Sequence, residues 1–169
     1  MDEVTFTPIG VVRTPFTTHE GMPIQTVAAG GVQGRIELDP AYAAGLADLD
    51  GFTHLHLITH LHRTGAASLR VTPYLDTTER GVFATRSPKR PNAIGLSLVR
   101  LVRIEGPVLH VEELDLLDGT PLLDIKPYVP PFDERADARY GWFERRAQNV
   151  HTVRADARFA EPAEPEEEA

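Results

Sequence analysis

A cluster of hydrogen-bond donors stands between two apolar segments in the middle of the chain. The segment Arg80–Leu101 reads RGVFATRSPKRPNAIGLSLVRL, in which Pro88 and Pro91 stiffen a polar stretch bracketed by Gly81 and Gly95. The donors are Arg86, Ser87, Lys89, Arg90 and Asn92. Guanidinium, ammonium and amide groups bind carboxylates and phosphates, and loops carry such groups where a rigid scaffold positions them. We therefore expect an anion-binding loop; the alternatives are a stiff surface hairpin and, for Arg86, an arginine that bonds loop carbonyls.

Carboxylates gather in a second polar segment, Leu114–Pro130, which reads LDLLDGTPLLDIKPYVP. Asp115 and Asp118 could act as general bases or favour a cationic ligand electrostatically. The Asp118-Gly119 pair predicts a turn with positive φ, so a plain hairpin is the alternative for this segment. A structural, ion-paired set is also open for Asp124, Lys126 and Tyr128.

Four histidines share one parity in the segment Gly51–Arg63, which reads GFTHLHLITHLHR. On a strand they would project to one face, opposite Leu55, Leu57, Thr59 and Leu61. The four are His54, His56, His60 and His62. Such a row spans up to about 27 Å, too far for one ion, so a polar wall or a subunit contact is favoured over a metal site.

Composition excludes several other chemistries. The 169 residues contain no cysteine, no Gly-x-Ser-x-Gly and no Gly-x-Gly-x-x-Gly, which disfavours thiolate sites, that type of serine nucleophile and a Rossmann cofactor site. The net charge of -8 disfavours a surface that binds nucleic acid everywhere, but it permits a local basic patch. The N-terminus resembles no secretory signal and no apolar run reaches the roughly 18 residues of a membrane span, so we expect a cytoplasmic protein.

Alternating apolar residues and many turn signals predict a mainly β chain, built as an antiparallel barrel or sandwich. A short helix is expected from Asp39-Pro40 to Leu49, and an amphipathic C-terminal helix over Asp133–Gln148. The chain is divided into a barrel domain at 1–132, a helical extension at 133–159 and an acidic disordered tail at 160–169. The expected strands are Val4–Arg13, Val32–Leu38, Phe52–His62, Ser68–Tyr74, Ala93–Ile104, Val108–Leu116 and Pro121–Ile125.

With the initial block Ile9–Phe16 (IGVVRTPF), these segments resemble the TsaA-like (TrmO-type) methyltransferase family, in family order over roughly residues 6–132. The resemblance implies a small antiparallel β-barrel-like methyltransferase domain that binds S-adenosyl-L-methionine. It also implies a homodimer with its site near the subunit interface, no required metal, and a tRNA substrate bound through its anticodon loop. Family members methylate N6 of a threonylcarbamoyl-modified adenosine beside the anticodon.

The family motifs carry roles onto matching positions of this sequence. Expected substrate contacts are Lys89, Arg90, Asn92, Lys126 and Tyr128; Arg90 and Asn92 match the family block, whereas Lys89 falls at a variable position. The base is unknown, with Asp115 and Asp118 as candidates. Cofactor contacts fall on Pro23, Ile24, Gln25, His62, Arg63, Arg86, Leu96, Asp115, Leu116, Leu117, Asp118, Gly119 and Thr120.

Two other functions stay open. Longer bacterial members carry an additional C-terminal domain, which together with the negative net charge leaves room for a small-molecule or other non-tRNA acceptor. A module that binds S-adenosyl-L-methionine without turnover is the second alternative.

Overall fold

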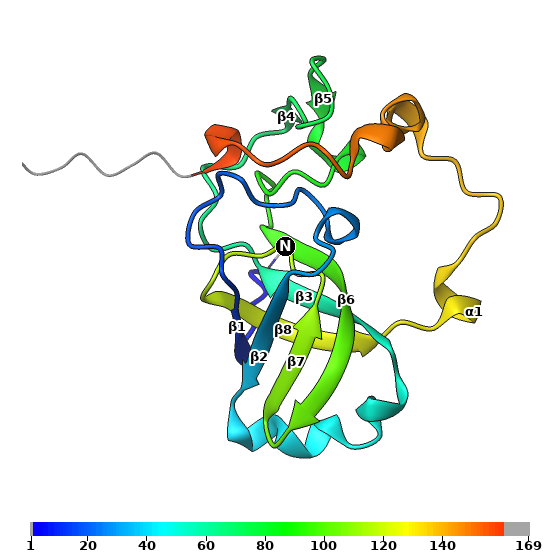
Figure 1. Ribbon diagram of the computed structural model, residues 1–169. Coiled ribbons are helices and arrows are strands. Elements are labelled where there is room, and N and C mark those ends of the chain that lie inside the picture. The colour runs from blue at the N-terminus through cyan, green and yellow to red at the C-terminus, as the bar shows by residue number, and fades with distance from the viewer. Residues whose placement is uncertain (1, 161–169) are drawn as a thin grey trace, which may run out of the picture.

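A computed structural model describes residues 2–160 of the chain (Figure 1). The acidic segment expected to be disordered lies outside the described residues, except for Ala160. The strands are β1 (Gly10–Arg13), β2 (Gln33–Leu38), β3 (His54–His60), β4 (Arg70–Val71), β5 (Arg80–Gly81), β6 (Ile94–Glu105), β7 (Val108–Glu112) and β8 (Thr120–Pro127). The described residues also contain one α-helix, α1 (Pro130–Asp133). The 3-10 turns are η1 (Thr26–Ala28), η2 (Pro40–Leu46), η3 (Leu49–Gly51), η4 (Val82–Ala84), η5 (Gly141–Arg145), η6 (Ala147–Asn149) and η7 (Ala157–Phe159).

Six strands close into an antiparallel barrel in the order β1-β2-β7-β6-β3-β8. Strand β3 lies between β6 and β8, with His54 opposite Arg100 and His60 opposite Ile94 in the β6 pairing. Closure removes the exposed edges that an open sheet of this size would leave. The prediction of a mainly β, antiparallel barrel is confirmed.

Alternation along the strands fills the barrel with aliphatic side chains. Leu55, Leu57 and Thr59 of β3 are fully buried, whereas His54 and His56 are half-buried on the other face, as the shared parity predicts. Each buried leucine contributes roughly 1.5–3 kcal/mol relative to exposure. The same core contains Val12, Ile36, Leu38, Val99, Leu109, Val111, Leu114, Leu116 and Leu122.

The two ends of the barrel differ (Figure 1). One end carries η2 and η3, where the Asp39 carboxylate accepts a 2.9 Å hydrogen bond from the Ala41 amide and Pro40 begins the turn. The predicted short helix here is therefore a 3-10 turn with the expected cap. The other end carries the cap, which we define as residues 14–32 and 61–93, and includes the small sheet β4-β5.

The predicted C-terminal helix over Asp133–Gln148 is wrong. Helix α1 has four residues and ends at Asp133, where the predicted helix begins; the chain then runs through bends and the 3-10 turns η5 and η6. Gly141 has φ +57°, a left-handed conformation that interrupts an α-helix. Tyr140, Trp142 and Phe143 line a cavity beside the cap, and Trp142 Nε1 donates a 2.8 Å hydrogen bond to Ala84 O of the cap.

Residues 134–160, here called the strap, cross the cap of the same chain. The Ala155 amide donates to Met22 O at 2.8 Å, and the Gly65 amide donates to Phe159 O at 3.1 Å. Phe159 is buried beside Val71 and Val82, and its ring meets Tyr74 edge-on at 4.8 Å. These contacts hold the strap in place against the cap. No helix within residues 2–160 is long and apolar enough to cross a membrane.

Candidate functional site

A cavity of about 1200 Å³ lies between the cap, the strap and the adjoining part of β6. Nearly all residues predicted to bind the cofactor line it, although they come from four separate segments of the chain. These residues are Pro23, Ile24, Gln25, His62, Arg63, Arg86, Leu96, Asp115, Leu116, Leu117 and Thr120. Asp118 and Gly119 are the predicted cofactor residues that do not line it.

Asp115 is the carboxylate of this cavity. Its Oδ1 accepts a 2.6 Å hydrogen bond from Ser97 Oγ, and the side chain is surrounded by protein except toward the cavity. Burial raises the pKa of Asp115 to about 6, against the opposing effects of the Ser97 hydrogen bond, backbone amides and the positive charge of Arg86. A carboxylate with this pKa accepts or releases a proton close to neutral pH.

Arg86 brings a positive charge to the same cavity. Its Nη1 donates a 2.7 Å hydrogen bond to Gln25 Oε1, and the Gln25 amide nitrogen donates to Ile24 O at 2.8 Å. This contact joins the arginine-rich loop to the loop that follows β1. The remaining guanidinium donors stay exposed, so Arg86 can bind a carboxylate or a phosphate in the cavity.

Arg90 is held differently, although it also lines the cavity. Its Nη1 donates to Thr85 O at 2.8 Å and to Val82 O at 3.2 Å, and its guanidinium carbon lies 5.7 Å from the centre of the Phe83 ring. The carbonyl-bonding arrangement considered for Arg86 is therefore found at Arg90. This arginine fixes the curvature of the loop that presents Arg86.

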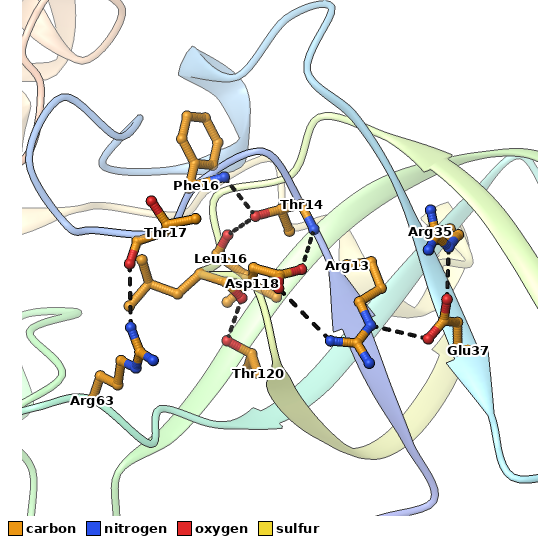
Figure 2. A network of polar contacts seen from close by, with 11 residues as sticks. Arg13, Thr14, Phe16, Thr17, Arg35, Glu37, Arg63, Leu116, Asp118 and Thr120 are labelled. Carbon is orange, nitrogen blue, oxygen red and sulfur yellow. Dashed lines mark hydrogen bonds and ion pairs between the residues drawn. The ribbon is translucent and has the colours of Figure 1, made fainter.

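Asp118 does not line the cavity, and Figure 2 shows it beside Thr14 and Arg13. Its Oδ1 accepts from the Thr14 amide at 3.1 Å, and its Oδ2 lies 3.7 Å from Arg13 Nη1. The Thr14 hydroxyl in turn donates to Leu116 O at 2.9 Å. Gly119 has φ +77°, as the Asp-Gly turn predicts. Of the two candidate bases, the geometry favours Asp115.

The other residues predicted to contact substrate lie off the cavity wall. Lys126 Nζ forms a 2.8 Å ion pair with Asp124 Oδ2, and the Tyr128 hydroxyl donates to Glu134 Oε1 at 3.2 Å. Tyr128 also packs edge-on against His56 on the outer barrel wall, at 5.6 Å. Lys89 and Asn92 belong to the arginine-rich loop without lining the cavity.

Most of the other lining residues were not predicted, and two contributions among them matter for the chemistry. The strap supplies Tyr140, Trp142 and Phe143, whose run of aromatics was interpreted as one face of a helix. Ser97 is 3% exposed, and its inward position in the apolar first half of β6 was the signal that a polar partner faces it. Within residues 2–160, no group of three or more histidine, aspartate or glutamate side chains could hold a metal ion.

Comparison with known proteins gives consistent matches. The family described as the tRNA-methyltransferase O N-terminal domain matches residues 11–134. A probable S-adenosyl-L-methionine-binding protein of Pyrococcus abyssi is 46% identical over 92% of this chain and 85% of its own length. The tRNA (adenine(37)-N6)-methyltransferase of Escherichia coli is 38% identical over 82% of this chain.

A crystal structure of TrmO from Pseudomonas aeruginosa matches with a TM-score of 0.71 and 38% identity over 83% of this chain. The chain spans 63% of the length of that structure and 63% of the Escherichia coli enzyme. Both proteins therefore contain a substantial portion with no counterpart in the matched region.

Proposed function

The chain belongs to the tRNA-methyltransferase O family of S-adenosyl-L-methionine-dependent methyltransferases, and from that premise we propose that its acceptor is N6 of adenosine 37 in a tRNA. The acceptor form is the threonylcarbamoyl-modified adenosine that the sequence resemblance implies. The 38% identity to the Escherichia coli enzyme supports this acceptor.

The cavity suits the cofactor chemically. S-adenosyl-L-methionine carries an amino-acid end, a sulfonium and an adenosine, and it supplies an electrophilic methyl group. The exposed guanidinium donors of Arg86 fit the carboxylate of the amino-acid end, and Asp115 fits a cationic neighbour. Leu96, Leu116 and Leu117 offer apolar surface to the remainder of the ligand.

Asp115 is the group that would accept the proton of the acceptor nitrogen during methyl transfer. Its pKa of about 6 leaves the carboxylate mostly ionised at pH 7, hydrogen-bonded to Ser97 and able to take a proton from an acceptor nitrogen. A ureido-substituted N6–H is more acidic than a free amine, so mild base assistance is enough. Arg86 orients the ligand, while the strap aromatics line the same cavity.

One observation carries the proposal: a carboxylate of raised pKa and an available guanidinium face the same cavity, on the segments that match the family. The test is methylation of two tRNA pools, with and without the threonylcarbamoyl group, followed by nucleoside mass spectrometry. We expect N6-methylated product from the modified pool. Absence of product from both pools, with saturable cofactor binding, contradicts the tRNA assignment.

A second candidate has a specific observation behind it. The Pyrococcus abyssi relative, of which the chain covers 85%, is described only as a binding protein. A binding module without turnover would bind S-adenosyl-L-methionine and yield no demethylated product with any acceptor. The same assay, extended to small-molecule acceptors, separates the three functions.

The expected homodimer and cytoplasmic location stay predictions. Ile94 and Leu96 are 42% and 49% exposed beside the cavity, and a second subunit would cover such apolar side chains. Light scattering at several protein concentrations measures the oligomeric state directly. A monomer at every concentration would contradict the dimer.

A further inference from the structure

A second cavity, of about 580 Å³, lies between the strap and the loop that joins β4 to β5. The loop contributes Asp76 and Arg80, and the strap contributes Trp142, Arg145 and Arg146. Arg80 is the first residue of the arginine-rich segment Arg80–Leu101, whereas the other four lie outside the family motifs that locate the larger cavity. The lining is strongly polar and contains three arginines in a chain whose net charge is -8.

Two carboxylates, Asp76 and Glu144, line this cavity, and both already accept hydrogen bonds. Glu144 Oε1 accepts a 3.3 Å hydrogen bond from the Tyr140 amide. The Asp76 side chain is 2% exposed, and its Oδ2 accepts hydrogen bonds of 2.9 and 2.7 Å from Arg80. Its Oδ1 accepts from the amides of Thr77 and Thr78 and lies 3.6 Å from Arg146 Nη2. Asp76 therefore fixes Arg80 firmly and Arg146 loosely, and it offers little negative charge to the interior of the cavity.

Arg145 and Arg146 supply the available positive charge. Within residues 2–160, the Arg145 side chain makes no ion pair and no hydrogen bond, and the Arg146 side chain is 46% exposed. Guanidinium groups bind phosphate oxygens through parallel N–H donors. The two neighbouring arginines thus form an anion-binding wall, in which Arg146 is held only by its 3.6 Å contact with Asp76.

Trp142 connects this wall to the larger cavity, because it lines both. Its Nε1 donates a 2.8 Å hydrogen bond to Ala84 O, and the Arg80 guanidinium lies over its ring at 5.5 Å. The tryptophan is fixed from both sides. A ligand that enters the larger cavity beside Trp142 therefore has the arginine wall as its immediate neighbour.

We propose that the second cavity binds a backbone phosphate of the RNA acceptor, next to the nucleotide whose base enters the larger cavity. Arg145 and Arg146 are the contacting groups, and Trp142 separates base from phosphate. This inference rests on the proposed tRNA function and names the surface that receives the tRNA backbone. The strap then supplies RNA contacts from within the segment that crosses the cap.

The experiment compares two double variants of the full chain. Arg145→Ala/Arg146→Ala removes the cavity wall, and Arg135→Ala/Arg139→Ala removes two exposed strap arginines that line neither cavity. The measurements are cofactor affinity by calorimetry, tRNA affinity as a function of salt, and the initial rate of methylation. Arg145→Ala alone leaves the contacts of Asp76 intact and shows whether any effect requires disturbing that residue.

We expect the cavity variant to bind tRNA at least tenfold more weakly, with the slope of log K against log salt reduced by about 1, the loss of one phosphate contact. Cofactor affinity stays unchanged, Arg145→Ala gives an intermediate loss, and the control pair changes tRNA affinity less than threefold. Equal losses in both double variants, or none in either, overturn the proposal.

Two further outcomes separate this proposal from its premise. If the unaltered chain binds cofactor but neither binds nor methylates tRNA, the proposed function fails and the phosphate subsite fails with it. If tRNA is methylated normally by the cavity variant, only the subsite is wrong. Inorganic phosphate is titrated in parallel; its binding at the arginines without any effect on tRNA assigns the cavity to a free anion and also overturns the proposal.

Discussion

The two sides of the segment between β7 and β8 present the same residue type to opposite environments. Asp115 on the inner side is enclosed beside Ser97, and burial raises its pKa to about 6. Asp118, three positions later, does not line the cavity and contacts the Thr14 amide and Arg13 (Figure 2). The inner carboxylate has proton chemistry available near neutral pH, whereas the outer one fastens the chain after β1 to the barrel rim. Environment, rather than residue type, separates the two roles.

Among the substitutions that test this comparison, Asp115→Asn is expected to have the largest effect on the methylation rate. The amide keeps the shape and can still accept from Ser97, but it takes no proton from an acceptor. We expect the methylation rate to fall at least 100-fold, a typical contribution of a positioned base. Cofactor affinity should change much less, and calorimetry on the same preparation measures it. A rate within threefold of the original would remove Asp115 from the proton transfer.

The pH dependence of the methylation rate tests the inner carboxylate without a mutation. Because the ionised form is the one that accepts a proton, kcat/KM should rise with pH through about 6 and then level off. A profile flat from pH 5 to 8 contradicts the role of this group. Asp115→Asn serves as the control, since its residual rate should lose this inflection.

The free energy of unfolding of the protein should depend on pH, in a direction set by the raised pKa of Asp115. The folded pKa lies above the ordinary value of 3.8, so the native state binds more protons between about pH 4 and 6 and loses stability as pH rises through that range. The Asp115→Asn variant has no carboxyl group at this position, so its free energy of unfolding should not fall in this way. From pH 4 to pH 7 the variant should therefore gain about 1–3 kcal/mol in free energy of unfolding relative to the original chain, measured by urea denaturation. No relative gain would contradict the burial of a charged carboxylate.

Arg86→Ala is expected to lower cofactor affinity about tenfold, because a charge-assisted hydrogen bond contributes roughly 1.5–3 kcal/mol. The substitution also removes a positive charge that lowers the pKa of Asp115, so the inflection of the rate profile should move to higher pH. Arg86→Lys, which keeps the charge without the fork of donors, should restore the inflection better than the affinity. Unchanged affinity in Arg86→Ala would exclude this arginine from the cofactor site.

Sequence pattern was sufficient for the barrel, and most of the residues predicted to bind the cofactor line one cavity. The alternation in β3 predicted that Leu55 and Leu57 face the core, and the family motifs identified residues that prove to line one cavity. Pattern could not separate Asp115 from Asp118, because strand periodicity does not set side-chain direction in the connection between strands. Each direction depends on partners distant in sequence, Ser97 for one and Thr14 for the other.

The strap illustrates a different limit. Its charged composition satisfies helix propensity, but Gly141 at positive φ and the contacts of Trp142 and Phe159 with the cap determine its course. Tertiary contacts of this kind override local propensity. The second cavity exists only because the strap and the β4-β5 loop meet, so no single segment of sequence predicts it.

The smallest expected effect comes from the outer side, through Asp118→Ala. The change leaves the Thr14 amide without its acceptor, which should lower the free energy of unfolding by about 1 kcal/mol. The ion pair with Arg13 adds little, because both side chains are substantially exposed. Cofactor affinity should stay within twofold, since Asp118 does not line the cavity. Denaturation at pH 7 should therefore give opposite results for the two aspartates, a gain in free energy of unfolding for Asp115→Asn and a loss for Asp118→Ala. If Asp118→Ala lowered cofactor affinity as much as Arg86→Ala, the outer aspartate would matter as much for cofactor binding as a residue that lines the cavity.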